Sequence, residues 1–168
     1  MHRLFNDGEY RMSLLIGCGI FFGLRISDIL QLTWEMLLSD KSFELIEKKT
    51  KKHREIRINS NFQKHVQKCY DALNITDRSE RCFVSRKNSV YSIQRINVLL
   101  KGIKAKYGLK SVKNFSSHSL RKTFGRHVYE KADTNGEMAL VMLSELFNHS
   151  NIAITKRYLG LRLSLIHI

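Results

Sequence analysis

The segment that most restricts the fold is residues 9–22, which is apolar on most sides and therefore unsuited to a protein surface. Its apolar side chains are those of Met12, Leu14, Leu15, Ile16, Cys18, Ile20 and Phe21. Gly23 follows directly, and a glycine in that place is typical of a helix end. We predict a buried helix here, in a chain of 168 residues that is long enough to bury a core of ordinary size.

The rest of the sequence favours short helices and one hairpin. Helical spacing of apolar residues predicts a helix from about Ser27 through Trp34, others over residues 61–73, 89–107, 118–131 and 138–147, and a last one, capped by Ser150 or Asn151, that reaches Tyr158. Alternation predicts strands at residues 43–46 and 55–58, and residues 81–85 are a candidate third. The predicted fold class is mainly α with a small antiparallel β-sheet, an α+β fold.

The charge of the chain points to a polyanionic partner. Lys and Arg total 29 against 15 Asp and Glu, a net charge of +14 that extends from Arg3 to Arg162. A folded domain this basic most often binds nucleic acid, with an anionic membrane surface as the weaker alternative. No apolar run is long enough to span a membrane and residues 1–7 are no signal peptide, so we expect a soluble intracellular protein.

The three cysteines favour reduced, buried thiols over a disulfide framework, because their number is odd and none forms a CxxC pair. His65 and Cys69 are four residues apart on a predicted helix but have no further ligands nearby. No metal site is therefore expected.

Arg25 and the tip of the predicted hairpin are two basic features of the first third of the chain. Arg25 lies in a tight joint between helices, where an arginine either anchors a structural ion pair or points into a site; its surroundings alone favour the ion pair. Asp28 falls in the first turn of the next helix, where a negative charge suits the helix dipole. Residues 48–54, KKTKKHR, form a basic tip that is either solvated or reaches a nucleic-acid backbone.

Two further histidines occupy positions suited to binding an anion. His118 and Arg121 project from the first turn of a predicted helix, where free backbone N–H groups favour a negative charge. His149 lies at the corner between the last two helices, after Asn148, a residue that tolerates the left-handed conformation. Tyr158 taken alone is a packing residue.

Together, four segments resemble the signature boxes of the tyrosine recombinases, also called phage-type integrases. The segments are GLRISDILQLTW from Gly23, KKT in the hairpin, HSLRKTF from His118 and LFNHSNIAITKRYL from Leu146. They occur in the family's order and roughly at its spacing, from about Met12 to Leu159. The resemblance implies the tyrosine recombinase catalytic-domain fold, which is of the DNA breaking-rejoining type.

The resemblance also implies roles for the basic residues. Arg25 and Arg121 match the two arginines that clamp the scissile phosphate, and Asp28 matches the acidic residue that buttresses the first. Lys49 best matches the hairpin lysine that protonates the leaving 5′ oxygen, although a one-residue shift in register exchanges it with its neighbours. The DNA contacts expected from the tip are Lys48, Lys51, Lys52 and Arg54.

Tyr158 matches the nucleophile, His118 the proton acceptor and His149 the residue that hydrogen-bonds the phosphate. The implied protein is a site-specific recombinase that acts on double-stranded DNA through a 3′-phosphotyrosyl intermediate, without metal, ATP or other cofactor. Its implied setting is a homotetrameric synapse on the nucleoid, in the cytoplasm and not at a membrane. Two alternatives remain: DNA relaxation of the type IB topoisomerase kind, and a truncated DNA-binding remnant that does not cleave.

We assign residues 1–162 to the catalytic domain. Members of the family generally carry a separate helical N-terminal domain that closes around DNA, and we expect this core-binding domain to be absent here. Residues 163–168, LSLIHI, match one reading frame of a transposase mosaic-end adaptor, so we expect this tail to be non-native or truncated.

Overall fold

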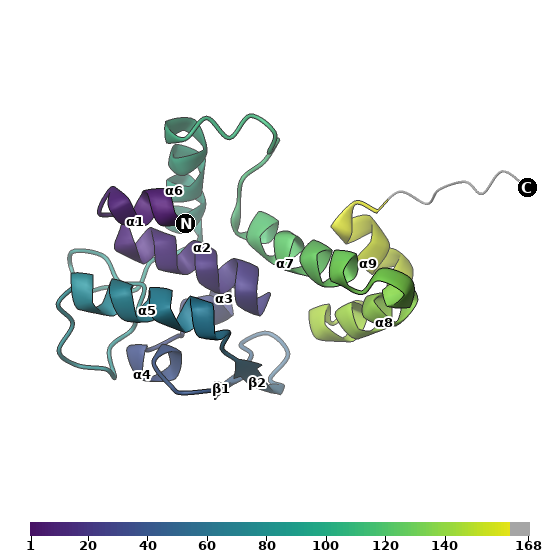
Figure 1. Cartoon of the computed structure of the whole chain (residues 1–168), viewed down its shortest axis with the longest axis horizontal. Helices are drawn as coiled ribbons and strands as arrows, with labels where there is room; N and C mark the ends of the chain where they lie inside the picture. Colours follow the sequence, from purple (N-terminus) through teal and green to yellow (C-terminus); the bar gives the residue numbers. More distant parts are fainter. Residues whose placement is uncertain (162–168) are drawn as a thin grey trace, which may run out of the picture. The chain divides into compact units, whose positions relative to one another are not determined.

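A computed structural model of the chain describes residues 1–161. The chain divides into two compact units, Met1–Arg121 and Lys122–Ile168 (Figure 1). Each unit has its own apolar core. The expected non-native tail, residues 163–168, lies outside the described residues. The predicted fold class is confirmed, since helices predominate and the described sheet is a single antiparallel pair. No described helix is both long and apolar enough to cross a membrane.

The first unit is built around α2 (Tyr10–Phe22), which confirms the buried helix expected from the sequence. The helices α1 (His2–Asn6), α3 (Ile26–Ile29) and α5 (Ser60–Ala72) pack against it (Figure 1). Gly23 ends α2 in the left-handed conformation, with φ 59° and ψ 24°. A Cβ atom added at Gly19 would lie 2.6 Å from Cβ of Leu120, so a glycine in α2 lets the start of α7 (Ser117–Lys131) approach closely.

The segment after α3 corrects one expectation. The sequence predicts one helix from Ser27 through Trp34, but the chain forms α3 and then α4 (Trp34–Leu37). Backbone bonds to a distant segment interrupt the helix: Cys82 N–H donates to the Leu32 carbonyl at 3.0 Å, and Trp34 N–H donates to the Glu80 carbonyl at 3.2 Å. These tertiary bonds outweigh the local helical pattern.

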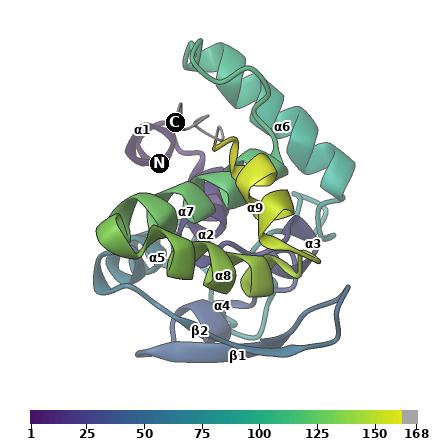
Figure 2. The same cartoon turned by 90° about the vertical axis from the view of Figure 1, so that its right-hand side faces the viewer.

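The hairpin forms close to where alternation predicts it. Its strands are β1 (Ser42–Ile46) and β2 (His53–Arg57), which lie side by side (Figure 2). Phe43 is paired with Ile56, and both side chains are buried. The inward face that carries Phe43 and Leu45 continues to Glu47, which is only 4% exposed. A carboxylate therefore occupies a core-facing position at the base of the basic tip.

The structure of the first unit also differs from the sequence prediction at residues 81–85 and at the start of the following helix. Residues 81–85 form isolated bridges, Thr33 to Arg81 and Val84 to Val90, and not a strand. The helix α6 (Ile93–Lys106) begins later than predicted, because Ser92 caps it by accepting a hydrogen bond from Arg95 N–H at 3.1 Å. The three cysteines are free and buried, as expected, and burial raises the pKa of Cys69 to about 12.

The second unit contains the rest of α7, a short 3₁₀ turn (Asp133–Asn135), α8 (Gly136–Phe147) and α9 (Ile152–Leu159). Its buried apolar core consists of Leu140, Leu143, Phe147 and Leu159. Asn148 ends α8 in the left-handed conformation, with φ 56°, as expected. Of the two predicted caps for α9, Asn151 is the one observed, because it accepts from Ile154 N–H at 3.0 Å.

Candidate active site

Arg25 forms a partly buried ion pair at the joint between α2 and α3. It is the N-cap residue of α3, in extended backbone conformation. Its Nη1 donates to Oε2 of Glu47 at 2.7 Å, and the two side chains are 20% and 5% exposed. The structure therefore gives Arg25 the ion pair that its surroundings favour, with a partner that the sequence analysis did not identify.

The base of the basic tip is fixed to the same joint by two further bonds. Oδ1 of the fully buried Asp28 accepts from the backbone N–H of Lys48 at 2.9 Å. Thr50 Oγ1 donates to Oε2 of Glu47 at 2.6 Å. Lys49 lies between these two anchored residues, and its side chain is exposed. Asp28 thus holds the hairpin that carries Lys49, besides lying one helical turn from Arg25.

Arg54 differs from the lysines of the tip. Its Nη1 lies 3.3 Å from Oε1 of Glu47, and its Nη2 donates to the Phe22 carbonyl at 3.0 Å, at the end of α2. Lys48, Lys51 and Lys52 are exposed instead. Arg54 is one of the four expected DNA contacts, but its guanidinium is directed to the base of the hairpin.

The charges around Glu47 keep it ionised. Burial alone would raise the pKa of the Glu47 carboxyl, but the hydrogen bond from Thr50 and the positive charges of Arg25 and Arg54 outweigh burial and leave that pKa below its usual range. One ionised carboxylate therefore contacts two arginines at physiological pH.

His118 and Arg121 occupy the first turn of α7 in the first unit, as predicted. His118 is exposed, whereas Arg121 is only 6% exposed. The close packing of Leu120 on Gly19 fixes this turn on α2. Arg121 is therefore a buried side chain on a turn that is packed against α2.

His149 and Tyr158 belong to the second unit. Their ring centroids are 5.3 Å apart, with an edge-on arrangement, and the Tyr158 ring also packs against Phe147 at 5.4 Å. His149 Nδ1 lies 2.9 Å from Oγ1 of the fully buried Thr155, so the imidazole is oriented by α9. The left-handed turn at Asn148 places His149 at this corner.

The structure thus brings together Arg25, Asp28 and the hairpin in the first unit, and His149 and Tyr158 in the second. Sequence reasoning missed Glu47, although a signal was present. Alternation from Phe43 through Leu45 directs Glu47 to the core, and a buried carboxylate requires a cationic partner. No cluster of three or more metal-ligating side chains occurs within residues 1–161.

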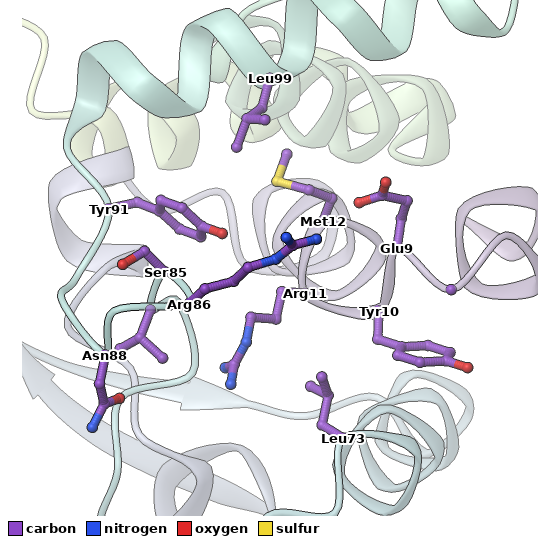
Figure 3. Close-up of a pocket in the computed structure, with 12 residues that line it drawn as sticks. Glu9, Tyr10, Arg11, Met12, Leu73, Ser85, Arg86, Asn88, Tyr91 and Leu99 are labelled. Atoms are coloured by element: carbon purple, nitrogen blue, oxygen red, sulfur yellow. The ribbon is translucent and has the colours of Figure 1, made fainter.

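A separate cavity of about 460 Å³ lies in the first unit near the N-terminal end of α2 (Figure 3). Arg86 extends into it from the turn at residues 85–88, with Tyr91 nearby. Arg11 also lines it and donates to the Cys82 carbonyl. Its lining includes none of the site residues predicted from the sequence, so we treat it as distinct from the candidate active site.

A helical domain with one antiparallel hairpin and this set of basic residues has the tyrosine recombinase catalytic-domain fold. Residues 5–163 match the model of the phage integrase family, and the chain belongs to that family. The resemblance noted in the sequence is therefore confirmed. The chain is also similar to the probable integrase/recombinase YoeC of Bacillus subtilis (strain 168), with 33% identity over 145 residues that cover 85% of this chain and 74% of that protein.

The fold also occurs in solved structures of other recombinases, of which three are compared with this chain. The crystal structure of XerA recombinase matches 94% of this chain with a TM-score of 0.72 and 20% identity. XerH site-specific recombinase bound to difH substrate, in a pre-cleavage complex, matches 89% with a TM-score of 0.65 and 21% identity. The Tn1549 transposon integrase with circular intermediate DNA matches 88% with a TM-score of 0.57 and 21% identity. The chain spans 56%, 42% and 52% of those three chains.

Proposed function

We propose that this chain is the catalytic part of a site-specific recombinase that cleaves and rejoins double-stranded DNA. The observation that carries the proposal is the contact between Tyr158 and His149, with ring centroids 5.3 Å apart, in a member of the phage integrase family. The XerH and Tn1549 proteins bind DNA in their solved structures, and the net charge of +14 of this chain suits the same polyanion.

In the proposed cleavage step, Oη of Tyr158 attacks the scissile phosphorus. The bond from phosphorus to the 5′ oxygen breaks, and a 3′-phosphotyrosyl bond forms in its place. His118 accepts the phenolic proton, because a phenol is otherwise largely protonated near neutral pH. Lys49 donates a proton to the departing 5′ oxygen. Attack by a 5′-hydroxyl on the phosphotyrosyl bond reverses these steps and rejoins the strand without ATP.

Arg25 and Arg121 form the proposed phosphate clamp, with His149 as a further hydrogen-bond donor. Guanidinium groups stay protonated and offer paired N–H donors to the non-bridging oxygens, where negative charge grows in the transition state. Each fixed donor of this kind contributes about 100-fold to 1000-fold in rate. Cationic side chains thereby take the part that divalent ions play in metal-dependent nucleases.

Lys48, Lys51 and Lys52 contact the DNA backbone in our proposal, because they are exposed on the tip beside Lys49. We assign Arg54 to the support of the hairpin base, since its guanidinium contacts Glu47 and the Phe22 carbonyl. The proposed assembly is a homotetramer on two duplexes, in the cytoplasm at the nucleoid. The mass of the protein–DNA complex, measured in solution, tests this stoichiometry.

A covalent-trapping assay tests the reaction. Nicked duplexes are prepared so that the short cleaved product diffuses away, and the mixture is run on a denaturing gel. We expect a protein–DNA adduct with the unmodified chain and none with Tyr158→Phe. Tyr129→Phe is the matched control, because it removes a phenolic hydroxyl from the same unit, and it should form the adduct.

Three outcomes separate the alternatives. An adduct that is unaffected by Tyr158→Phe contradicts the assignment of the nucleophile. Salt-sensitive DNA binding without any adduct indicates a non-cleaving DNA-binding protein. Relaxation of supercoiled plasmid that lacks a specific site indicates a topoisomerase activity.

A further inference from the structure

We propose that Glu47 is a positioning residue for Arg25, and this role rests on the proposed recombinase function. The Glu47 carboxylate lies 2.7 Å from Nη1 of Arg25 and is 5% exposed in its side chain, whereas Arg25 is 20% exposed. Glu47 thus holds Nη1 of the guanidinium, while the Arg25 side chain keeps part of its surface exposed. A phosphate that approaches from solvent then meets a group that is already oriented.

The remaining contacts of Glu47 explain why its own position is fixed. Oε2 also accepts from Thr50 Oγ1 at 2.6 Å, and Oε1 faces Nη1 of Arg54 at 3.3 Å. Its backbone N–H donates to the Lys52 carbonyl at 3.0 Å, and its carbonyl accepts from Lys51 N–H at 2.9 Å. Glu47 is therefore bonded through both carboxylate oxygens and through its backbone, so it can hold the arginine in one orientation.

Positioning of Arg25 by Glu47 is a different role from neutralising the charge of the nearby arginines. Arg54 already lies against Oε1 and contributes a positive charge. Oε2 is the oxygen that meets Arg25, at the shorter of the two distances. Glu47→Gln keeps the shape of the side chain but loses the charge and one acceptor oxygen. Arg25 is then less restrained, and a misplaced clamp lowers the rate of cleavage more than it weakens DNA binding.

The test is single-turnover cleavage of the nicked duplex at saturating protein, together with the Kd for DNA. We expect Glu47→Gln to slow cleavage by about 10-fold to 100-fold while the Kd changes by less than about 3-fold. Glu55→Gln is the matched control, because it removes an exposed carboxylate from the same hairpin, and it should cleave like the unmodified chain. Equal rates for Glu47→Gln and Glu55→Gln overturn the proposal.

A second substrate separates Arg25 from Lys49. When sulfur replaces the bridging 5′ oxygen, the leaving thiolate needs no protonation, because a thiol is far more acidic than an alcohol. A defect that acts through Arg25 persists on this substrate, and that is the result we expect for Glu47→Gln. Full recovery of the rate means that Glu47 acts through the hairpin lysine, and it overturns the proposal.

A double-mutant cycle gives an independent readout. If Glu47 acts through Arg25, Glu47→Gln has a much smaller effect in an Arg25→Lys background than alone. Equal effects in both backgrounds contradict the proposal. Should Glu47→Gln fail to fold, Glu47→Asp retains the negative charge and withdraws the carboxylate from Arg25, so it should slow cleavage in the same way; an unchanged rate overturns the role. Absence of any adduct with the unmodified chain overturns the recombinase function itself, and the role of Glu47 with it.

Discussion

The two units hold their candidate site residues by different forces. In the first unit, Arg25 is oriented by the buried carboxylate of Glu47, and the hairpin is tied to Asp28. In the second, the Tyr158 ring packs edge-on against Phe147 and His149. Orientation in the first unit therefore depends on ionised groups, whereas orientation in the second involves ring packing and the uncharged hydroxyl of Thr155. Removing the charge of Arg25 should then cost more folding free energy than removing the hydroxyl of Tyr158 while its ring is kept.

Arg25→Met and Tyr158→Phe give the sharpest test of this difference. Both should reduce cleavage by at least about 100-fold, since each removes a group that we propose acts on the phosphate. Arg25→Met should also lower the free energy of unfolding by about 1–3 kcal/mol, because Glu47 stays buried with fewer partners. Tyr158→Phe keeps the ring contacts with Phe147 and His149, so it should lower stability less than Arg25→Met does. Urea unfolding measures both, and equal stability losses would contradict the comparison.

Leu159→Ala tests the packing of the second unit. Leu159 is fully buried in a small core with Leu140, Leu143 and Phe147. Its truncation should lower the stability of that unit by about 2–5 kcal/mol, through lost apolar contact and a residual cavity. Hydrogen exchange should show lost amide protection in α8 and α9 and unchanged protection in α2. The matched change in the first unit, Leu15→Ala, should reduce protection in α2.

Acid should lower the stability of the first unit through protonation of Glu47. The pKa of this carboxyl is lowered in the folded chain from an ordinary value of 4.5. Its ionised form therefore stabilises the fold above about pH 4.5, and this contribution is lost as the pH falls through the lower folded pKa. Glu47→Gln should flatten this part of the pH dependence of stability, whereas Glu55→Gln should not. An unchanged acid slope in Glu47→Gln would assign the effect to other carboxyl groups.

Local patterns in the sequence predicted the elements well where local forces decide them. Residues 9–22 are apolar on most sides, and they form the buried α2 that ends at Gly23. The predicted helix from Ser27 through Trp34 failed because its backbone bonds to residues around Glu80 and Cys82, far away in the sequence. No local pattern contains that information.

The candidate site also depends on long-range contacts that local sequence patterns do not contain. Family resemblance identified Arg25, His118, Arg121, His149 and Tyr158, and their roles stay predictions. The resemblance did not identify Glu47, because its partners Arg25 and Arg54 lie far from it in the chain or across a hairpin turn. Such an ion pair depends on the tertiary fold, although the inward alternation of β1 places the carboxylate on the correct face.

The smallest effect is expected at Asn148, which shapes the corner that carries His149. Its backbone has φ 56° and ψ 49°, a conformation that a residue with a Cβ atom adopts at a cost of about 1–2 kcal/mol, and glycine without that cost. Asn148→Ala and Asn148→Gly both remove the side-chain amide, so their difference isolates the backbone. Asn148→Gly should be more stable than Asn148→Ala by about 1 kcal/mol in urea unfolding. If the two variants unfold alike, the left-handed backbone conformation at Asn148 does not limit the stability of this corner.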